Sequence, residues 1–332
     1  MAMESTKSTN QQPRLNLSKF CQTDLSRKLA RWAPYQLSQM YVSCLGGFYY
    51  SRHPEERELI RRTIRQVFGE ALPRLHLERL YRRTFAGIFA HYQEKLFLAY
   101  APVARVKTHL EQRLRLSGTA ELNRALSTQR GVIVVTGHYG AVEFLPGALS
   151  LQGYPVAIIV RPQTKELAES LTRRAAAINL TLIMPEDGNV LPAALKALRE
   201  GRILVTEVDE FPMWRLSKTE TVNFLGFRMP ADRTLEVLQK RSGAPLVTAL
   251  VRREPKRRYC LDISPIGWAS PPPMISRRCL QHLERAIVAA PEQWYQWKEF
   301  GKILAGLPQR AAPARLQESY APQVCEAHYA PA

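Results

Sequence analysis

The sequence has 332 residues, of which 45% are hydrophobic and 23% are charged. A chain of this length and composition can bury a sizeable core in one large or two average domains, which excludes a small scaffold that depends on disulfides or metal for its folding. With 47 Lys and Arg against 29 Asp and Glu, the formal net charge is +18. Such an excess attracts nucleic acid, an anionic membrane surface or an acidic carrier protein without specifying a fold.

The chain begins with a polar segment that is followed by a helical region. Residues 1–14 lack the apolar core of a secretory signal, and we predict a disordered leader there. Residues 15–116 show the apolar spacing of helices and no convincing strand, with a basic helix over 54–70 and a longer helix over 75–100. We expect a helical amino-terminal region.

The most apolar stretches of this region are Tyr35–Tyr50 and Thr84–Ala104. Polar residues interrupt both, so neither reaches the ~18–20 apolar residues that a membrane-spanning helix needs. Two alternatives remain open for Tyr35–Tyr50. It lies in a membrane interface as an amphipathic helix, next to the basic helix, or it packs on the protein core.

The pattern changes at Gly131, where strands begin to alternate with helices. We predict strands over 131–136, 155–160, 180–184, 202–208, 244–252 and 259–265, and helices ending near 152 and over 164–178, 190–199, 233–242 and 275–290. Residues 209–224 are expected to be irregular, Gly267–Pro273 to be a Pro-rich connector and 307–332 to be a disordered tail. The alternation indicates an α/β domain over 117–306, with a mostly parallel central sheet covered by helices on both faces.

The segment Val135–Glu143 carries the residues best suited to chemistry. A buried strand ends, Gly137 allows a sharp turn, and His138 follows at the carboxyl end of the strand, where open α/β sheets bind their ligands. The side chain of Glu143 can converge on His138 if His138 lies on the turn and Glu143 in the first turn of the next helix. Pro146 is compatible with such a first turn, because its missing N–H would be unpaired there anyway.

A histidine and a carboxylate suit the activation of a hydroxyl group. The neutral imidazole takes the proton of the hydroxyl as it attacks a carbonyl, while the carboxylate fixes the tautomer and stabilises the imidazolium. The sequence has no nucleophilic serine of the G-x-S-x-G type, which favours direct transfer from a thioester without a covalent acyl-enzyme. The alternative is a satisfied loop histidine beside a helix-capping glutamate.

The cysteine and histidine patterns predict no metal or cofactor. The five cysteines are odd in number and form no C-x-x-C pair, and the seven histidines show no ligand spacing. We therefore expect neither a disulfide framework nor a metal site.

The segment Gly131–Glu143 resembles the catalytic block of the bacterial lipid A late acyltransferases, the lauroyl and myristoyl transferases, within the wider glycerolipid acyltransferase-like fold and its H-x4-D/E motif. Four further blocks follow in the order of that family: Val160–Pro162, Ala194–Asp209, Phe224–Gly226 with Ser242–Pro245, and Pro291–Trp294 with Trp297. The likeness covers residues 81–300. It implies an O-acyltransferase of lipopolysaccharide synthesis that moves a fatty acyl chain from acyl carrier protein or coenzyme A to a hydroxyl of a lipid or glycolipid.

The sequence departs from the pattern of that family in three respects. Ala141 and Val142 stand where the family has an Asn-Trp pair, Glu210 follows Asp209 where the family has Gln, and no clear amino-terminal membrane anchor is visible. These departures retain the histidine and the acid, and they bear on which acceptor the protein uses.

Within this frame His138 is the predicted general base and Glu143 its orienting partner, and three further charged residues are candidates for substrate binding. Arg161 and Asp209 each end a strand, so Arg161 could hold a phosphate of the acceptor or the donor and Asp209 could contact acceptor hydroxyls. Arg233 opens a helix that could face the same crevice. A structural ion pair for Arg161 and a structural acid for Asp209 are the alternatives.

The expected partners are the acyl donor, a lipid or glycolipid acceptor and an anionic membrane, with no nucleic acid. We expect a peripheral protein on the cytoplasmic face of the inner membrane. A basic protein that binds nucleic acid or membrane without catalysis is the alternative, although no nucleic-acid-binding module is recognisable. Trp214, Trp294 and Trp297 could lie at a lipid interface or in the core.

Overall fold

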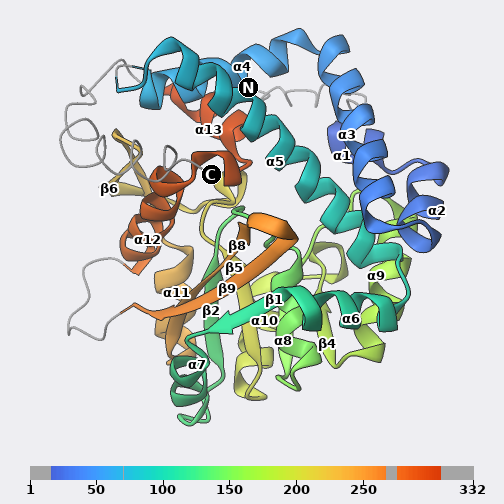
Figure 1. The fold of residues 1–332 in the computed structure, drawn as a ribbon. Coiled ribbons are helices and arrows are strands. Elements are labelled where there is room, and N and C mark those ends of the chain that lie inside the picture. The colour runs from blue at the N-terminus through green and yellow to red at the C-terminus, as the bar shows by residue number, and fades with distance from the viewer. Residues whose placement is uncertain (1–15, 70, 267–274, 308–332) are drawn as a thin grey trace, which may run out of the picture.

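The apolar strand Val132–Thr136 (β2) lies inside a seven-stranded sheet and is buried along its whole length. A computed structural model describes residues 16–69, 71–266 and 275–307 (Figure 1). The predicted leader, the connector Gly267–Pro273 and the tail beyond Leu307 lie outside the described residues.

The sheet is mostly parallel, which confirms the predicted fold class. Its strands are, in spatial order, β1 (Leu114–Ser117), β9 (Arg258–Pro265), β8 (Leu246–Glu254), β2, β5 (Ile203–Glu207), β3 (Val156–Ile159) and β4 (Leu180–Ile183). Only the β8–β9 pair is antiparallel among these neighbours. The carboxyl ends of β2, β5 and β3 therefore meet at one edge, with β5 between the other two.

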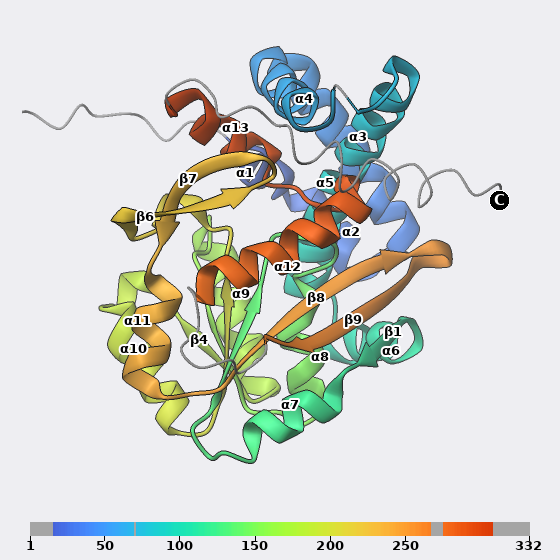
Figure 2. The ribbon, with the colours of Figure 1, turned by 90° about the vertical axis from the view of Figure 1, so that its left-hand side faces the viewer.

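Helices cover both faces of the sheet, as a continuous apolar strand requires. Ile133 and Val135 of β2 face one core together with α10 (Val190–Arg199), α11 (Thr234–Ser242) and α12 (Ile275–Ala289). Val132 and Val134 face a second core with α6 (Val103–Arg113), α7 (Thr119–Leu126) and α8 (Phe144–Leu151). Figure 2 shows α10 and α11 on one side of the sheet and α6 and α8 on the other. The helix α9 (Lys165–Ala177) packs against β4, and the last described helix, α13 (Trp297–Gly306), packs against the amino-terminal region.

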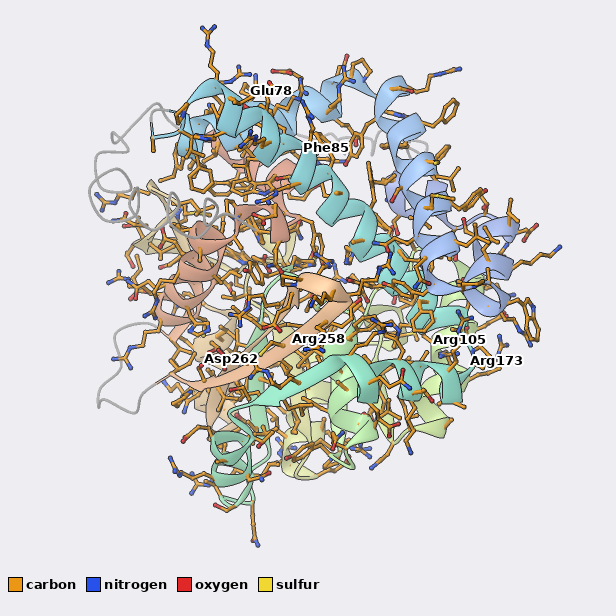
Figure 3. All side chains as sticks on the ribbon, viewed as in Figure 1. Glu78, Phe85, Arg105, Arg173, Arg258 and Asp262 are labelled. Carbon is orange, nitrogen blue, oxygen red and sulfur yellow. The ribbon has the colours of Figure 1, made fainter. Side chains whose placement is uncertain are left out.

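The amino-terminal region is helical, as predicted, and gathers along one long helix (Figure 1). Its helices are α1 (Leu17–Cys21), α2 (Asp24–Trp32), α3 (Tyr35–Arg52), α4 (Pro54–Phe68), α5 (Arg74–Tyr100) and α6 (Val103–Arg113). A buried bidentate ion pair ties α5 to β8, with Arg253 Nε 2.8 Å from Glu94 Oε1 and Nη2 2.7 Å from Oε2. The end of α2 is held from α6, where Arg105, labelled in Figure 3, donates to the carbonyls of Arg31 and Ala33. These contacts make the region part of the same core as the sheet.

Two predictions about strands were wrong. Residues 114–116, assigned to the helical region, form β1 together with Ser117 at the sheet edge, where they pair with β9. The segment expected to be irregular contains β6 (Leu216–Phe224), which forms an antiparallel hairpin with β7 (Phe227–Asp232). Short 3-10 turns complete the described structure: η1 (Pro185–Asp187), η2 (Phe211–Met213), η3 (Pro255–Arg257) and η4 (Pro291–Gln293).

The helix α3 packs on the protein core, which is one of the two alternatives considered for Tyr35–Tyr50. Its inner face packs on α5, where Tyr50 and Phe85 form an edge-on ring pair with centroids 4.9 Å apart. Its outer face leaves Met40 62% and Phe48 51% exposed. Across the described residues, we find no helix with the length and apolar character needed to cross a membrane.

Candidate active site

The candidate site lies where the neighbouring strands β2 and β5 end. Thr136 pairs with Glu207, so the residues that follow each strand emerge next to each other. His138 comes two residues after the end of β2, and Asp209 comes two residues after the end of β5. Strand order thus brings together side chains that are 71 positions apart in the sequence.

The turn after β2 is held rigidly by its neighbours. The N–H of Gly140 donates to the carbonyl of Gln293 at 2.9 Å, and the N–H of Ala141 donates to the carbonyl of Val251 at 2.8 Å. Gly140 has φ +58°, and a Cβ placed there would lie 1.8 Å from the Val251 carbonyl oxygen. A glycine is therefore required at this position, and the turn presents His138 in one orientation.

Asp209 fixes the imidazole of His138. Its Oδ1 lies 2.9 Å from His138 Nδ1, and both of its carboxylate oxygens accept the backbone N–H of His138 at 3.0 Å. The indole N–H of Trp294 donates to Oδ2 at 2.7 Å. Asp209 and Trp294 are both fully buried. Because an ionised carboxylate only accepts, Nδ1 carries the hydrogen and Nε2 is the nitrogen left for chemistry.

Two more carboxylates face that second nitrogen. Glu207 Oε2 lies 3.3 Å and Glu210 Oε2 3.4 Å from His138 Nε2. Burial by itself lowers the pKa of His138, but Glu207, Asp209 and Glu210 outweigh it and raise the pKa well above its usual value. Burial also raises the pKa of Glu207, against the opposing effect of His138. The cluster therefore has a strong affinity for positive charge.

Glu143 occupies the position expected for it and has partners from α5. It is the N-cap residue of α8, and Pro146 lies in the first turn of that helix. Its Oε1 lies 3.7 Å from Lys95 Nζ and 3.6 Å from His91 Nε2. The pKa of His91 is lowered well below its usual range, first by burial and then by Lys95. Lys95 is thus the charged partner of Glu143.

An aromatic stack connects Glu143 to His138. The ring of Tyr295 stacks on His91, with centroids 3.8 Å apart, and meets the ring of His138 edge-on at 5.3 Å. Sequence reasoning did not assign a role to His91, Lys95 or Tyr295. The available signal was the run of polar residues inside an otherwise apolar helical stripe, because buried polar groups in such a stripe require partners.

The two predicted basic residues lie on different elements. Arg161 follows β3 and is exposed, and its guanidinium donates to the sulfur of Met213 in η2. That turn comes directly after Glu210, so Arg161 lies beside the carboxyl edge of the sheet. Arg233 is the exposed N-cap residue of α11, after the β6–β7 hairpin.

Of the two tryptophans after η4, Trp297 is fully buried like Trp294, whereas Trp32 of α2 is 71% exposed.

An apolar pocket lies next to the cluster, between α8, α9 and the strands β3 and β4. Aliphatic side chains make up most of its lining, including Leu98, Val106, Leu151, Ile158, Leu171, Ile178 and Leu182. Its polar lining residues are Thr136, Glu143, Arg174 and Glu207. Glu207 also contacts His138 Nε2, so one side chain borders both the pocket and the imidazole.

This arrangement can remove a proton from a group bound at Nε2 while an apolar chain lies in the pocket. It also contains one set of metal-ligand atoms, from His138, Glu207 and Glu210, that lie within 4.8 Å of one another. The sequence spacing, which predicts no metal site, does not reveal this set because its members come from two strands.

A family model described as bacterial lipid A biosynthesis acyltransferase matches residues 27–299. A search of curated proteins gave no match. The matched range begins in α2 and ends in α13, and so includes the amino-terminal helices, the sheet and the candidate site.

Proposed function

Because the chain belongs to the bacterial lipid A biosynthesis acyltransferase family, and is therefore an O-acyltransferase acting on a lipid A precursor, we propose that His138 is the general base that activates the acceptor hydroxyl. The observation that carries this proposal is the fully buried Asp209 on Nδ1, which leaves Nε2 beside an apolar pocket. Asp209 is then the positioning residue of the imidazole, a role that the sequence assigns to Glu143.

The acyl group can pass from donor to acceptor in one direct transfer, without a covalent acyl-enzyme. The acceptor oxygen attacks the thioester carbonyl carbon, and its proton passes to His138 Nε2. The C–O bond forms, the C–S bond breaks, and the proton on Nε2 passes to the departing thiolate. Nε2 must be unprotonated when the hydroxyl arrives, and Glu207, 3.3 Å away, is positioned to hold the proton that the cluster otherwise keeps on His138.

The donor is proposed to be an acyl thioester of acyl carrier protein or coenzyme A. Its acyl chain occupies the apolar pocket, because burying each CH2 group there is worth ~0.8 kcal/mol. Glu143, paired with Lys95, and Glu207 both line the pocket. The net charge of +18 favours the docking of an acidic carrier.

Mass spectrometry tests this function directly. Purified protein, an acyl thioester and a lipid A precursor are expected to yield a product heavier by one acyl group, and an ester-cleaving base should release that group. Total lipids from cells with and without the gene should differ by the same mass. A precursor that stays unmodified with every acyl thioester tried would refute the proposal.

Gly147 offers a test of the acyl pocket. A Cβ at this position of α8 would meet only Leu98 Cδ1, at 3.5 Å, so a leucine side chain can enter the pocket. We expect Gly147→Leu to shift the preferred donor to shorter chains. Excluding two CH2 groups should lower kcat/KM for the original donor ~15-fold, at ~0.8 kcal/mol each. Competition between donors of different length, read by mass spectrometry, measures the shift.

Gly306→Leu is the matched control, because Gly306 ends α13 and has no atom within 4 Å of its added Cβ. It should leave the chain-length preference unchanged. An unaltered preference in folded Gly147→Leu would show that the acyl chain binds elsewhere.

The outer face of α2 and α3 is proposed to dock on the membrane. Its exposed apolar side chains are Leu25, Trp32, Leu37, Met40 and Phe48. Those of α3 lie along one side of the helix, where apolar side chains can enter a membrane interface. Exposed Arg31 and Arg52 lie next to them and add attraction to anionic lipid. We therefore propose a peripheral protein at the inner membrane.

The double variant Met40→Glu with Phe48→Glu should weaken binding to vesicles of anionic lipid at least about tenfold, because it adds charge to the inserted face. Both side chains are exposed, so folding should be unaffected. The control Leu75→Glu with Leu216→Glu changes two equally exposed leucines on α5 and β6. Vesicle sedimentation that gives the same affinity for both double variants would rule out this docking face.

A further inference from the structure

The structure assigns a divalent-cation site to His138, Glu207 and Glu210, at which a Zn²⁺-like ion binds the imidazole and reversibly stops acyl transfer. The inhibitory consequence rests on the proposed role of His138 as base. The site itself rests on the geometry of three side chains and is tested separately below.

The distances suit a tetrahedral ion. Ligand atoms that lie ~2.0–2.1 Å from Zn²⁺ are ~3.3–3.4 Å from one another in tetrahedral geometry. His138 Nε2 lies 3.3 Å from Glu207 Oε2 and 3.4 Å from Glu210 Oε2. The three ligand atoms all fall within 4.8 Å. The side chains of Glu207 and Glu210 are both partly exposed, so their carboxylates can adjust to the ion.

The imidazole is already prepared as a metal ligand. Asp209 accepts the N–H of Nδ1 at 2.9 Å, so Nε2 is the nitrogen that faces the two glutamates, where a metal ion would take the place of its proton. A histidine whose other nitrogen donates to a carboxylate is the usual arrangement behind a metal-bound imidazole, where it fixes the ring and raises its basicity. Trp294 holds that carboxylate in turn at 2.7 Å.

The charge balance favours a cation as well. Glu207, Asp209 and Glu210 surround one imidazole. Imidazole and carboxylate together suit Zn²⁺ better than Mg²⁺, which prefers oxygen ligands in octahedral geometry. Three protein ligands leave a fourth position for water. A metal on Nε2 occupies the lone pair that must receive the proton of the acceptor, so the ion and the reaction exclude each other.

Calorimetry on the full-length protein, stripped with a chelator and titrated with ZnCl2 in excess Mg²⁺, tests the site. We expect one ion per chain with micromolar affinity, at least tenfold weaker in Glu210→Gln and lost in His138→Ala. Glu121→Gln is the matched control, since α7 precedes β2 and lies at the opposite edge of the sheet. Co²⁺ should give the visible absorption of a tetrahedral site. The absence of binding, or binding that all three variants retain equally, overturns the assignment.

Assays of acyl transfer distinguish a wrong metal-site assignment from a wrong proposed function. Free Zn²⁺ at about ten times the calorimetric Kd leaves about one tenth of the protein without the ion, so it should lower the rate of acyl transfer about tenfold, and a chelator should restore it. Transfer that proceeds at full rate with Zn²⁺ bound overturns the inhibitory role. A protein without any acyl transfer refutes the function, whereas the calorimetric result still decides whether the ion binds.

Discussion

Replacing His138 by Ala should lower kcat for acyl transfer by ~10²–10⁴-fold, because an acceptor hydroxyl is a poor nucleophile until a base takes its proton. The side chain projects from a turn that backbone hydrogen bonds hold, so the variant should fold. Single-turnover rates with purified protein and a fixed acyl thioester measure the loss.

His53→Ala serves as the control for His138→Ala. It removes an imidazole between α3 and α4, where Nδ1 lies 2.8 Å from the carbonyl oxygen of Tyr49. Its rate should stay near that of the parent protein. A folded His138→Ala protein that transfers acyl groups at the parent rate would remove His138 from the mechanism.

Asp209→Asn should be at least as damaging, with kcat reduced by ~10³–10⁴-fold as expected when a catalytic histidine loses the acid that sets its tautomer. The carboxylate of Asp209 accepts three N–H groups, from the backbone and ring of His138 and from Trp294. An amide has only one acceptor oxygen, so at least one of these donors would face an NH2 group. The imidazole is then free to turn or change tautomer.

Glu143→Gln distinguishes the two acids. The sequence predicts severe impairment of this variant because it assigns the orientation of His138 to Glu143. In the structure the charged partner of Glu143 is Lys95. Nitrogen-15 spectra of the His138 ring should therefore show the Nδ1–H tautomer in Glu143→Gln and its loss in Asp209→Asn. The opposite pair of spectra would return the orienting role to Glu143.

Local sequence determines most of the elements. The apolar, β-branched run of β2 predicted a strand covered on both faces, and the strand is fully buried. Apolar residues at helical spacing similarly predicted α5 within one residue of its observed bounds. The position of His138 at a strand end, and of Pro146 in the following first turn, also follows from neighbouring residues alone.

The missed strands lack such local signals. The four residues of β1 pair only with β9, more than 140 positions away. The β6–β7 hairpin turns through Leu225 and Gly226 with φ of +50° and +82°. A two-residue turn of this kind ordinarily shows Asn or Asp before the Gly, because both residues need positive φ. Here Glu284 of α12 accepts the N–H of Leu225 at 2.8 Å, a tertiary contact that helps to hold the leucine there.

The sequence by itself determined that an α/β sheet presents a histidine at the end of a buried strand. It also determined that the chain is basic and that its motifs follow the order of one acyltransferase family. Only the tertiary structure decided which acids surround that histidine. The sequence predicted Glu143 as the partner of His138 because the two are only five positions apart. In the structure β5 lies next to β2, and this strand order places Asp209 against His138 Nδ1. The order of strands depends on which faces the connecting helices cover, and that is settled by packing across the whole chain rather than by any local pattern.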